Sequence, residues 1–383
     1  MTRFLATTAL ALSLPLAAAA EVRVGMLVTL SGPAALLGEQ ARDGFRLALD
    51  NLGGTLGGEP ATLLVEDDEL KPDVALTKVK ALTERDGAQI VVGTIFSNIL
   101  QAIYKPVTDS GAFLISPNAG PSTFAGANCH PNFFVTSYLN NHNYEALGLY
   151  ANEQGFKRVF MLAPNYQAGR DGTTGFQATY TGEIADEVYT PLGHNDFSAE
   201  IARIATSGAD ALFVFMPGGM GVRFVKQFAA AGLTDKIAVL SAFTVDETTL
   251  PAQQDDALGM FGVAGWAPDL DNPTNAAFVA AFEAKYGYVP GSYAAQAYDA
   301  AMLIDSAVRK AGGVADKDAF RAALREADFA SVRGDFAFNT NHYPIQDFHL
   351  LGVVKRPDGK FATSALQTIM KDATDTLAAE CRM

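Results

Sequence analysis

Basic residues are few in this chain, and their shortage excludes one class of partner. The 28 Lys and Arg residues stand against 42 Asp and Glu residues, so the formal net charge is -14 over 383 residues. Nucleic-acid binding depends on Lys and Arg side chains that neutralise phosphates. We therefore expect no nucleic-acid partner. The acidic balance predicts a well-solvated surface and does not indicate the charge of a ligand.

Long apolar runs are missing after residue 20. A bilayer span needs roughly 20 apolar residues, and no later stretch reaches that length. At the start of the chain, Arg3 precedes an apolar stretch from Phe4 to about Ala17, and small residues come before Glu21. This pattern is typical of a secretory signal. We expect cleavage near Ala20 and a mature protein that is soluble outside the cytoplasm. An uncleaved anchor or a buried first helix is the alternative.

Cysteine is almost absent, with only Cys129 and Cys381 in the chain. In an exported protein, two lone thiols form one disulfide more often than a metal site or a nucleophile. We predict that the two are bridged, which would tie the C-terminal tail to the body of the protein.

The motifs of common enzyme classes are also missing. The chain has no Gly-x-Ser-x-Gly turn, no Gly-x-x-x-x-Gly-Lys-Ser/Thr loop, no His-Glu-x-x-His and no Gly-x-Gly-x-x-Gly after its first predicted strand. Its five histidines are scattered without metal-ligand spacing. We expect no metal, no cofactor and no enzymatic activity, and an exported hydrolase is the enzyme alternative.

Apolar residues, in contrast, make up 49% of the chain, enough for a sizeable core in two domains. Short apolar runs alternate with stretches of helical period, which predicts repeated β-α units and parallel sheets. Because the runs are nearly continuous, both faces of each sheet should be covered by helices. The pattern predicts an α/β protein with two doubly wound lobes. The main strands are expected at 22–30, 61–68, 88–93, 112–117, 158–164, 184–189, 211–216, 237–243 and 261–266.

Open α/β sheets bind ligands beyond the carboxyl ends of their strands, where this chain has distinctive loops. They read LVTLSGPAALLG, GTIFSNILQ, LISPNAGPS, LAPNYQAGRDG, FMPGGMG, LSAFTVDE and GWAPDLDNP. With the exported start, their order resembles the periplasmic solute-binding proteins of ATP-driven (ABC) importers. Among these it is most similar to the leucine/isoleucine/valine-binding branch of the type I fold. The resemblance covers Val22 to Met383.

The resemblance implies a protein of two lobes that the chain crosses three times, near Tyr138, Ala267 and Ser331. The lobes would comprise residues 21–138 plus 268–330 and residues 139–267 plus 331–383. Hinge closure would clamp a small molecule between them for delivery to an ABC-type membrane permease. We expect a periplasmic monomer. A sensory protein with the same fold is an alternative.

In the first lobe, the resemblance places ligand-holding residues in two loops. Ser97 and Asn98 fall in the loop after the third strand, and Asn118, Ala119 and Gly120 fall in the loop after the fourth, which typically binds a carboxylate. Donors at a helix start suit a small anion, and Ser97 or Asn98 would equally serve as a simple helix cap.

In the second lobe, the chain departs from the amino-acid binders. Where that branch has a carboxylate that pairs with the ligand's ammonium group, this sequence has Phe243, followed by Thr244 and Val245. Asp246 would substitute only if the loop bends differently. A buried ammonium group without a counter-charge costs several kcal/mol, so a plain amino acid fits poorly.

The remaining candidates suggest an aromatic box for a flat ring. Its predicted lining is Leu37, Phe96, Tyr166 with the adjacent Gln167, Phe243, Thr244 and the single tryptophan, Trp266. Such a lining resembles that of family members that take up benzoate and cinnamate derivatives, because aromatic side chains stack on a flat ring. We therefore predict an aromatic carboxylate as ligand, with a branched-chain or other neutral amino acid, or an amide, as the alternative. Phe96 and Phe243 would otherwise be core residues, and Trp266 would fill the hinge.

Overall fold

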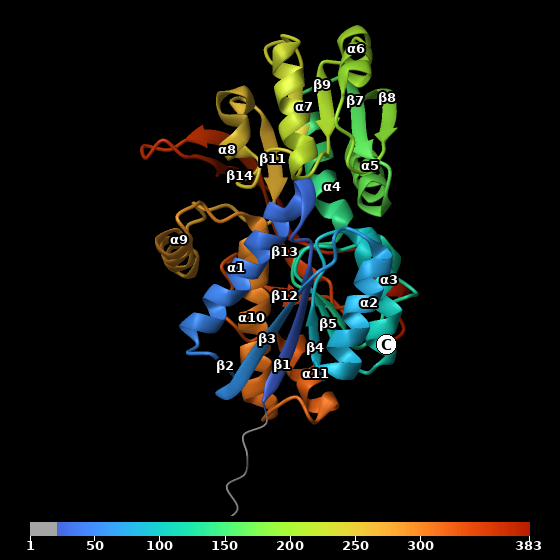
Figure 1. Cartoon of the computed structure of the whole chain (residues 1–383). Helices are drawn as coiled ribbons and strands as arrows, with labels where there is room; N and C mark the ends of the chain where they lie inside the picture. The colour runs from blue at the N-terminus through green and yellow to red at the C-terminus, as the bar shows by residue number, and fades with distance from the viewer. Residues whose placement is uncertain (1–20) are drawn as a thin grey trace, which may run out of the picture.

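The computed structural model describes residues 21–383, so the predicted signal segment lies outside the described residues. Two lobes, each built on one sheet, are stacked end to end (Figure 1). The first sheet has the order β2-β3-β1-β4-β5-β6, and all neighbours are parallel except the β2-β3 hairpin. Its strands are β1 (Val22–Val28), β2 (Thr55–Leu56), β3 (Glu59–Asp67), β4 (Ile90–Val92), β5 (Phe113–Ser116) and β6 (Phe133–Val135).

The second sheet has the order β12-β13-β11-β10-β9-β7-β8, and β14 pairs with β13. Its centre, from β11 to β8, is parallel, whereas β13 runs antiparallel to β11 and to β14. Its strands are β7 (Arg158–Pro164), β8 (Glu183–Thr190), β9 (Ala211–Val214), β10 (Ala238–Ser241), β11 (Phe261–Ala264), β12 (Ala337–Phe338), β13 (Pro344–Lys355) and β14 (Phe361–Ala373).

Helices lie on both faces of each sheet, which confirms the predicted doubly wound α/β class (Figure 1). Within residues 21–383, no helix is long and apolar enough to cross a bilayer. The helices are α1 (Ala35–Asn51), α2 (Pro72–Lys80), α3 (Ser97–Asp109), α4 (Asn140–Glu153), α5 (Gln167–Thr179), α6 (Ser198–Thr206), α7 (Gly219–Ala230), α8 (Leu250–Gln253), α9 (Pro273–Tyr286), α10 (Ser292–Ala311) and α11 (Lys317–Glu326). Short turns of helix are η1 (Gly32–Ala34), η2 (Ala81–Arg85), η3 (Ser122–Phe124), η4 (Gln254–Ala257) and η5 (Leu377–Glu380).

The start of α5 differs from the expectation and affects the site. The sequence predicts a helix from Gly172, because glycines in this segment indicate a loop. In the structure α5 begins at Gln167, and a Cβ on Gly169 would lie only 1.9 Å from the carbonyl oxygen of Pro164. Glycine is therefore required there for close backbone packing. As a result, Tyr166 sits directly before the helix, in extended conformation.

The end of the chain returns to the first lobe. Cys129, just before β6, is bridged to Cys381 with a Cα–Cα distance of 5.7 Å, which confirms the predicted disulfide. Figure 1 shows the C-terminus beside α3, although β13 and β14 extend into the other lobe. Helices α9, α10 and α11 lie beside the first sheet, and α10 packs along α1 (Figure 1). The lobe boundaries stated above stay a prediction.

Candidate ligand-binding site

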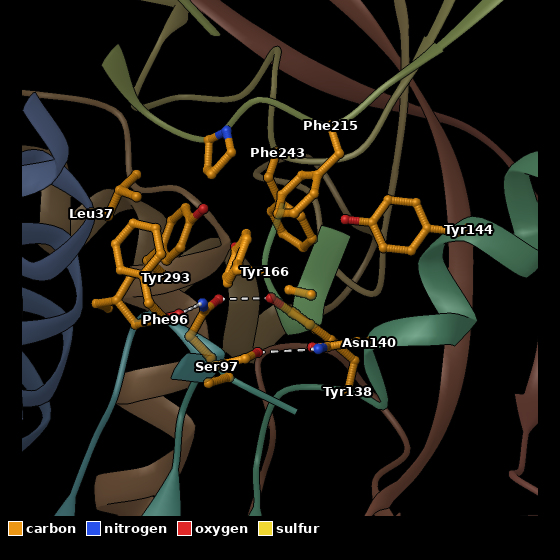
Figure 2. Close-up of a pocket in the computed structure, with 15 residues that line it drawn as sticks. Leu37, Phe96, Ser97, Tyr138, Asn140, Tyr144, Tyr166, Phe215, Phe243 and Tyr293 are labelled. Carbon is orange, nitrogen blue, oxygen red and sulfur yellow. Dashed lines mark hydrogen bonds between the residues drawn. The ribbon is translucent and has the colours of Figure 1, made fainter. Parts of the chain in front are cut away.

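A cavity lies between the lobes, beyond the carboxyl ends of the parallel strands. The space between its lining atoms, open solvent included, is about 360 Å³. The lining residues, shown in Figure 2, are Leu37, Ile95, Phe96, Ser97, Asn118, Ala119, Tyr138, Asn140, Tyr144, Tyr166, Ala168, Phe215, Pro217, Phe243 and Tyr293.

Seven residues that the sequence singled out are brought together on this wall. They come from α1, from the loops after β4, β5, β7 and β10, and from the start of α3, because these loops all open toward the interlobe space. The seven are Leu37, Phe96, Ser97, Asn118, Ala119, Tyr166 and Phe243.

Trp266 and Thr244 do not line the cavity, because each is occupied by structural contacts. Trp266 is fully buried and its indole N–H donates to Asn275 Oδ1 at 2.7 Å, which fixes α9 to the end of β11. The Thr244 hydroxyl donates to Val214 O at 3.1 Å and accepts from Met216 N–H at 2.8 Å. Trp266 thus packs between the end of β11 and α9, and Thr244 joins the loops after β9 and β10.

Asn98, Gly120 and Gln167 also lie outside the lining. The Gly120 N–H, which the resemblance assigned to a carboxylate, donates to Asn140 Oδ1 at 3.1 Å. Gln167 bridges the lobes instead, since its Oε1 accepts from Gln101 Nε2 at 3.3 Å. Asn98 is half-buried behind Ser97, and its Oδ1 has no hydrogen-bond partner among the described residues.

Eight lining residues were missed by the sequence interpretation. They are Ile95, Tyr138, Asn140, Tyr144, Ala168, Phe215, Pro217 and Tyr293. The strand-end rule would have found Phe215 and Pro217, which directly follow the strand β9. Tyr144 and Tyr293 carried no such signal, because a tyrosine on the buried face of a helix looks like a core residue in sequence.

Polar groups at one end of the cavity are held by a network that joins the lobes. Asn140, at the start of α4, donates from Nδ2 to Ser97 Oγ at 3.2 Å and to Asp171 Oδ2 at 2.9 Å (Figure 2 shows the first contact). Asp171 also accepts from the Ser122 hydroxyl of the first lobe at 2.7 Å. Ser97 Oγ is therefore an acceptor toward Asn140, and its own proton remains available to a ligand.

The start of α3 supplies further donors at the same place. The first N–H groups of a helix have no carbonyl one turn back, and they favour negative charge. Those of Ser97 and Asn98 are in this position. The Ala119 N–H is instead taken by Thr94 O at 3.2 Å. Asn118 is fixed on both sides, because its Nδ2 donates to Ile95 O at 2.6 Å and its Oδ1 accepts from the Tyr138 hydroxyl at 2.8 Å.

Aromatic rings form the rest of the wall. The Phe243 ring stacks on Tyr138, with centroids 5.3 Å apart, and meets Phe215 edge-on at 6.3 Å. Tyr166 lies 6.1 Å from Phe215 and 6.2 Å from Phe96. Phe243 has a φ of 59°, which is rare for a bulky residue and is typical of functional sites. The Phe243 ring thus lines the cavity from the loop after β10.

No charged side chain lines this cavity among residues 21–383. Asp246 was the remaining candidate to pair with an ammonium group, but it lies behind the wall. Its Oδ1 accepts from the Thr248 N–H at 2.8 Å and from the Thr248 hydroxyl at 2.5 Å, and it is buried. The loop therefore does not bend to bring this carboxylate into the cavity.

The adjacent Glu247 makes stability depend on pH. It is buried at the lobe interface, where its Oε1 accepts from the Thr363 N–H at 2.7 Å, and burial raises the pKa of its carboxyl to about 7. The unfolded chain loses this proton first, near the ordinary value of 4.5. Stability should therefore fall as pH rises from about 4.5 to 7, by up to about 3 kcal/mol, and change no further from this group above pH 7.

Urea unfolding of the wild type and of Glu247→Gln at several pH values between 5 and 8 measures this effect. The amide can still accept from Thr363 but does not ionise, so the variant should gain on the wild type as pH rises. Parallel pH profiles of the two proteins would contradict the prediction.

The periplasmic binding protein family matches residues 21–360 of this chain. The Leu/Ile/Val-binding protein homolog 6 of Brucella melitensis is 28% identical over 392 residues, covering 98% of this chain and 99% of that protein. A solute-binding protein of an ABC transporter from R. palustris, in complex with benzoate, is 32% identical with a TM-score of 0.89, covering 95% of this chain and 100% of that one.

A second such protein, from Rhodopseudomonas palustris BisB5 in complex with 3,4-dihydroxy benzoic acid, is 28% identical with a TM-score of 0.86. That likeness covers 92% of this chain and 98% of the other. The two R. palustris proteins are solute-binding proteins of ABC transporters, and the Brucella relative is named for Leu/Ile/Val binding. The family match runs through both lobes and the cavity between them, and this chain accordingly belongs to the periplasmic binding protein family.

Proposed function

We propose that this protein captures a small aromatic carboxylate of the benzoate type in the periplasm. The observation that carries the proposal is the pairing of hydroxyl and N–H donors around Ser97 with a cavity wall to which the described residues contribute no acidic side chain. An anion is held by such donors without a counter-charge. The ammonium group of an amino acid would be buried there without a partner, at a cost of several kcal/mol.

In the proposed complex, the carboxylate lies against the Ser97 hydroxyl and the start of α3. The ring lies among the aromatic side chains and Leu37, and Asn118 and Ala119 complete the first-lobe side. Relatives with benzoate and 3,4-dihydroxy benzoic acid support this class of ligand. A relative named for Leu/Ile/Val binding makes a neutral amino acid the second candidate ligand. The lining contributed by residues 21–383 has no carboxylate to pair with its ammonium group, which disfavours this candidate.

The proposal extends to the protein's surroundings. Residues 1–20 would direct export and be removed near Ala20, and the mature chain would act as a monomer. It would deliver its ligand to the membrane permease of an ABC importer, as its relatives from ABC transporters suggest.

Isothermal titration of residues 21–383 with benzoate and with leucine tests the proposal. We expect benzoate to bind and leucine not to bind. Ser97→Ala should weaken benzoate binding by about tenfold or more, because it removes a charge-assisted hydrogen bond worth roughly 1.5–3 kcal/mol. Ser110→Ala, at the other end of α3, is the matched control and should bind like the wild type. Leucine binding without any binding of an aromatic acid would refute the proposal.

A further inference from the structure

Three tyrosines that line the cavity have hydroxyls without a hydrogen-bond partner among residues 21–383. The chain has twelve tyrosines, and eight of their hydroxyls take part in hydrogen bonds within residues 21–383. Of the other four, Tyr144, Tyr166 and Tyr293 line the cavity, and Tyr150 does not. Buried hydroxyls normally find a partner, so their concentration here points to a group that the ligand supplies.

Two of the three pack against the same ring, that of Phe215. Tyr144 comes from α4 and Tyr166 from the residue before α5, and their ring centroids lie 5.7 Å and 6.1 Å from that of Phe215. In Figure 2 the hydroxyl of Tyr144 points toward Phe215 and Phe243. Neither hydroxyl takes part in the Ser97–Asn140 contact.

These hydroxyls remain neutral donors under all physiological conditions. Burial raises the pKa of Tyr144 and of Tyr166 well above the ordinary value, and their proximity raises that of Tyr144 further. A neutral phenol both donates and accepts a hydrogen bond, as a hydroxyl group on a ligand does. A second carboxylate on the ligand would suit them less well, because no basic side chain lines the cavity in the described part of the chain.

We infer that Tyr144 and Tyr166 recognise a hydroxyl group on the ligand's ring, so that this protein selects hydroxylated aromatic acids over the unsubstituted acid. The inference rests on the proposed function. A bare ring presents only C–H groups to the two tyrosines and leaves their hydroxyls unpaired when the lobes are closed. A site built to hydrogen-bond a ligand hydroxyl discriminates strongly against the analogue that lacks it.

Titration of the wild type with benzoate, 3-hydroxybenzoate and 4-hydroxybenzoate tests the inference. We expect at least one hydroxybenzoate to bind about tenfold or more tightly than benzoate. The double variant Tyr144→Phe/Tyr166→Phe removes only the two hydroxyls. It should retain benzoate binding and lose the preference, and each single variant should lose part of it.

Tyr150→Phe is the matched control, because it removes an unpartnered hydroxyl from the same helix, α4, outside the cavity. It should keep the wild-type preference. Equal affinity of the wild type for benzoate and both hydroxybenzoates would overturn the inference. A preference for hydroxybenzoate that survives in the double variant would overturn it too. Either result would leave the proposed function unchanged. Tighter binding of terephthalate than of 4-hydroxybenzoate would assign the pair to a second carboxylate instead. Binding of leucine alone would overturn the proposed function and the inference together.

Discussion

Replacing Arg333 by methionine is expected to lower the free energy of unfolding by about 3–5 kcal/mol. The guanidinium and the Asp299 carboxylate are 1% and 0% exposed, and Arg333 Nε lies 3.0 Å from Asp299 Oδ2. The variant would leave Asp299 buried without its cation. Urea unfolding measured by circular dichroism provides the comparison, and a loss of less than about 1 kcal/mol would contradict the prediction.

The same arginine joins segments that are far apart in the chain. Its Nη1 donates to Ser137 O at 3.1 Å and to Gln346 Oε1 at 2.8 Å, so it joins the segment before Tyr138, where the first crossing is predicted, to β13. Ser137 precedes Tyr138, which lines the cavity. We therefore expect Arg333→Met to weaken ligand binding as well. The double variant Arg333→Met/Asp299→Leu also removes the carboxylate that Arg333→Met leaves buried without its cation. It should therefore recover part of the lost stability.

Removing the disulfide should have the second large effect. The bridge joins residues 252 positions apart, and a cross-link that closes so long a loop strongly restricts the unfolded chain. We expect Cys129→Ser/Cys381→Ser to lose about 4 kcal/mol, with an unchanged ligand affinity because neither cysteine lines the cavity.

Chemical reduction of the wild type supplies an independent check, since it should reproduce the unfolding midpoint of the double variant. Unfolding midpoints that agree between the oxidised wild type and the variant would show that the bridge does not restrict the unfolded chain. The cysteine variant should be less stable but bind the ligand with wild-type affinity, whereas Arg333→Met should lose both stability and affinity.

The succession of strands and helices along the chain and the fold class were predictable, because parallel strands buried on both faces are continuous apolar runs. The strand β9 is buried throughout, and its sequence ALFV is accordingly apolar without alternation. The start of α5 was not predictable, since Gly169 indicates a loop in sequence but serves close packing against Pro164. A glycine needed for close packing and one needed for a turn look the same in sequence.

The candidate site divides in a similar way. Residues at strand ends, such as Phe96 and Phe243, were found because the carboxyl ends of parallel strands meet at one edge of a sheet. Tyr144 and Tyr293 were missed because helix orientation and lobe closure decide which buried aromatic side chains face a cavity. Trp266 was assigned to the lining and packs between the end of β11 and α9, where its N–H bonds to Asn275.

The sequence by itself determined the two-lobed α/β architecture, the cysteine pair and the presence of Phe243 in the loop after β10, because these follow from hydrophobic period, composition and the identity of single residues. Only the tertiary structure decided which donors are free. The N–H groups of Ala119 and Gly120 donate to other groups of the protein, whereas the hydroxyls of Tyr144 and Tyr166 have no hydrogen-bond partner within residues 21–383. Hydrogen bonds between residues far apart in the chain depend on how the two lobes meet, and local sequence does not encode that geometry.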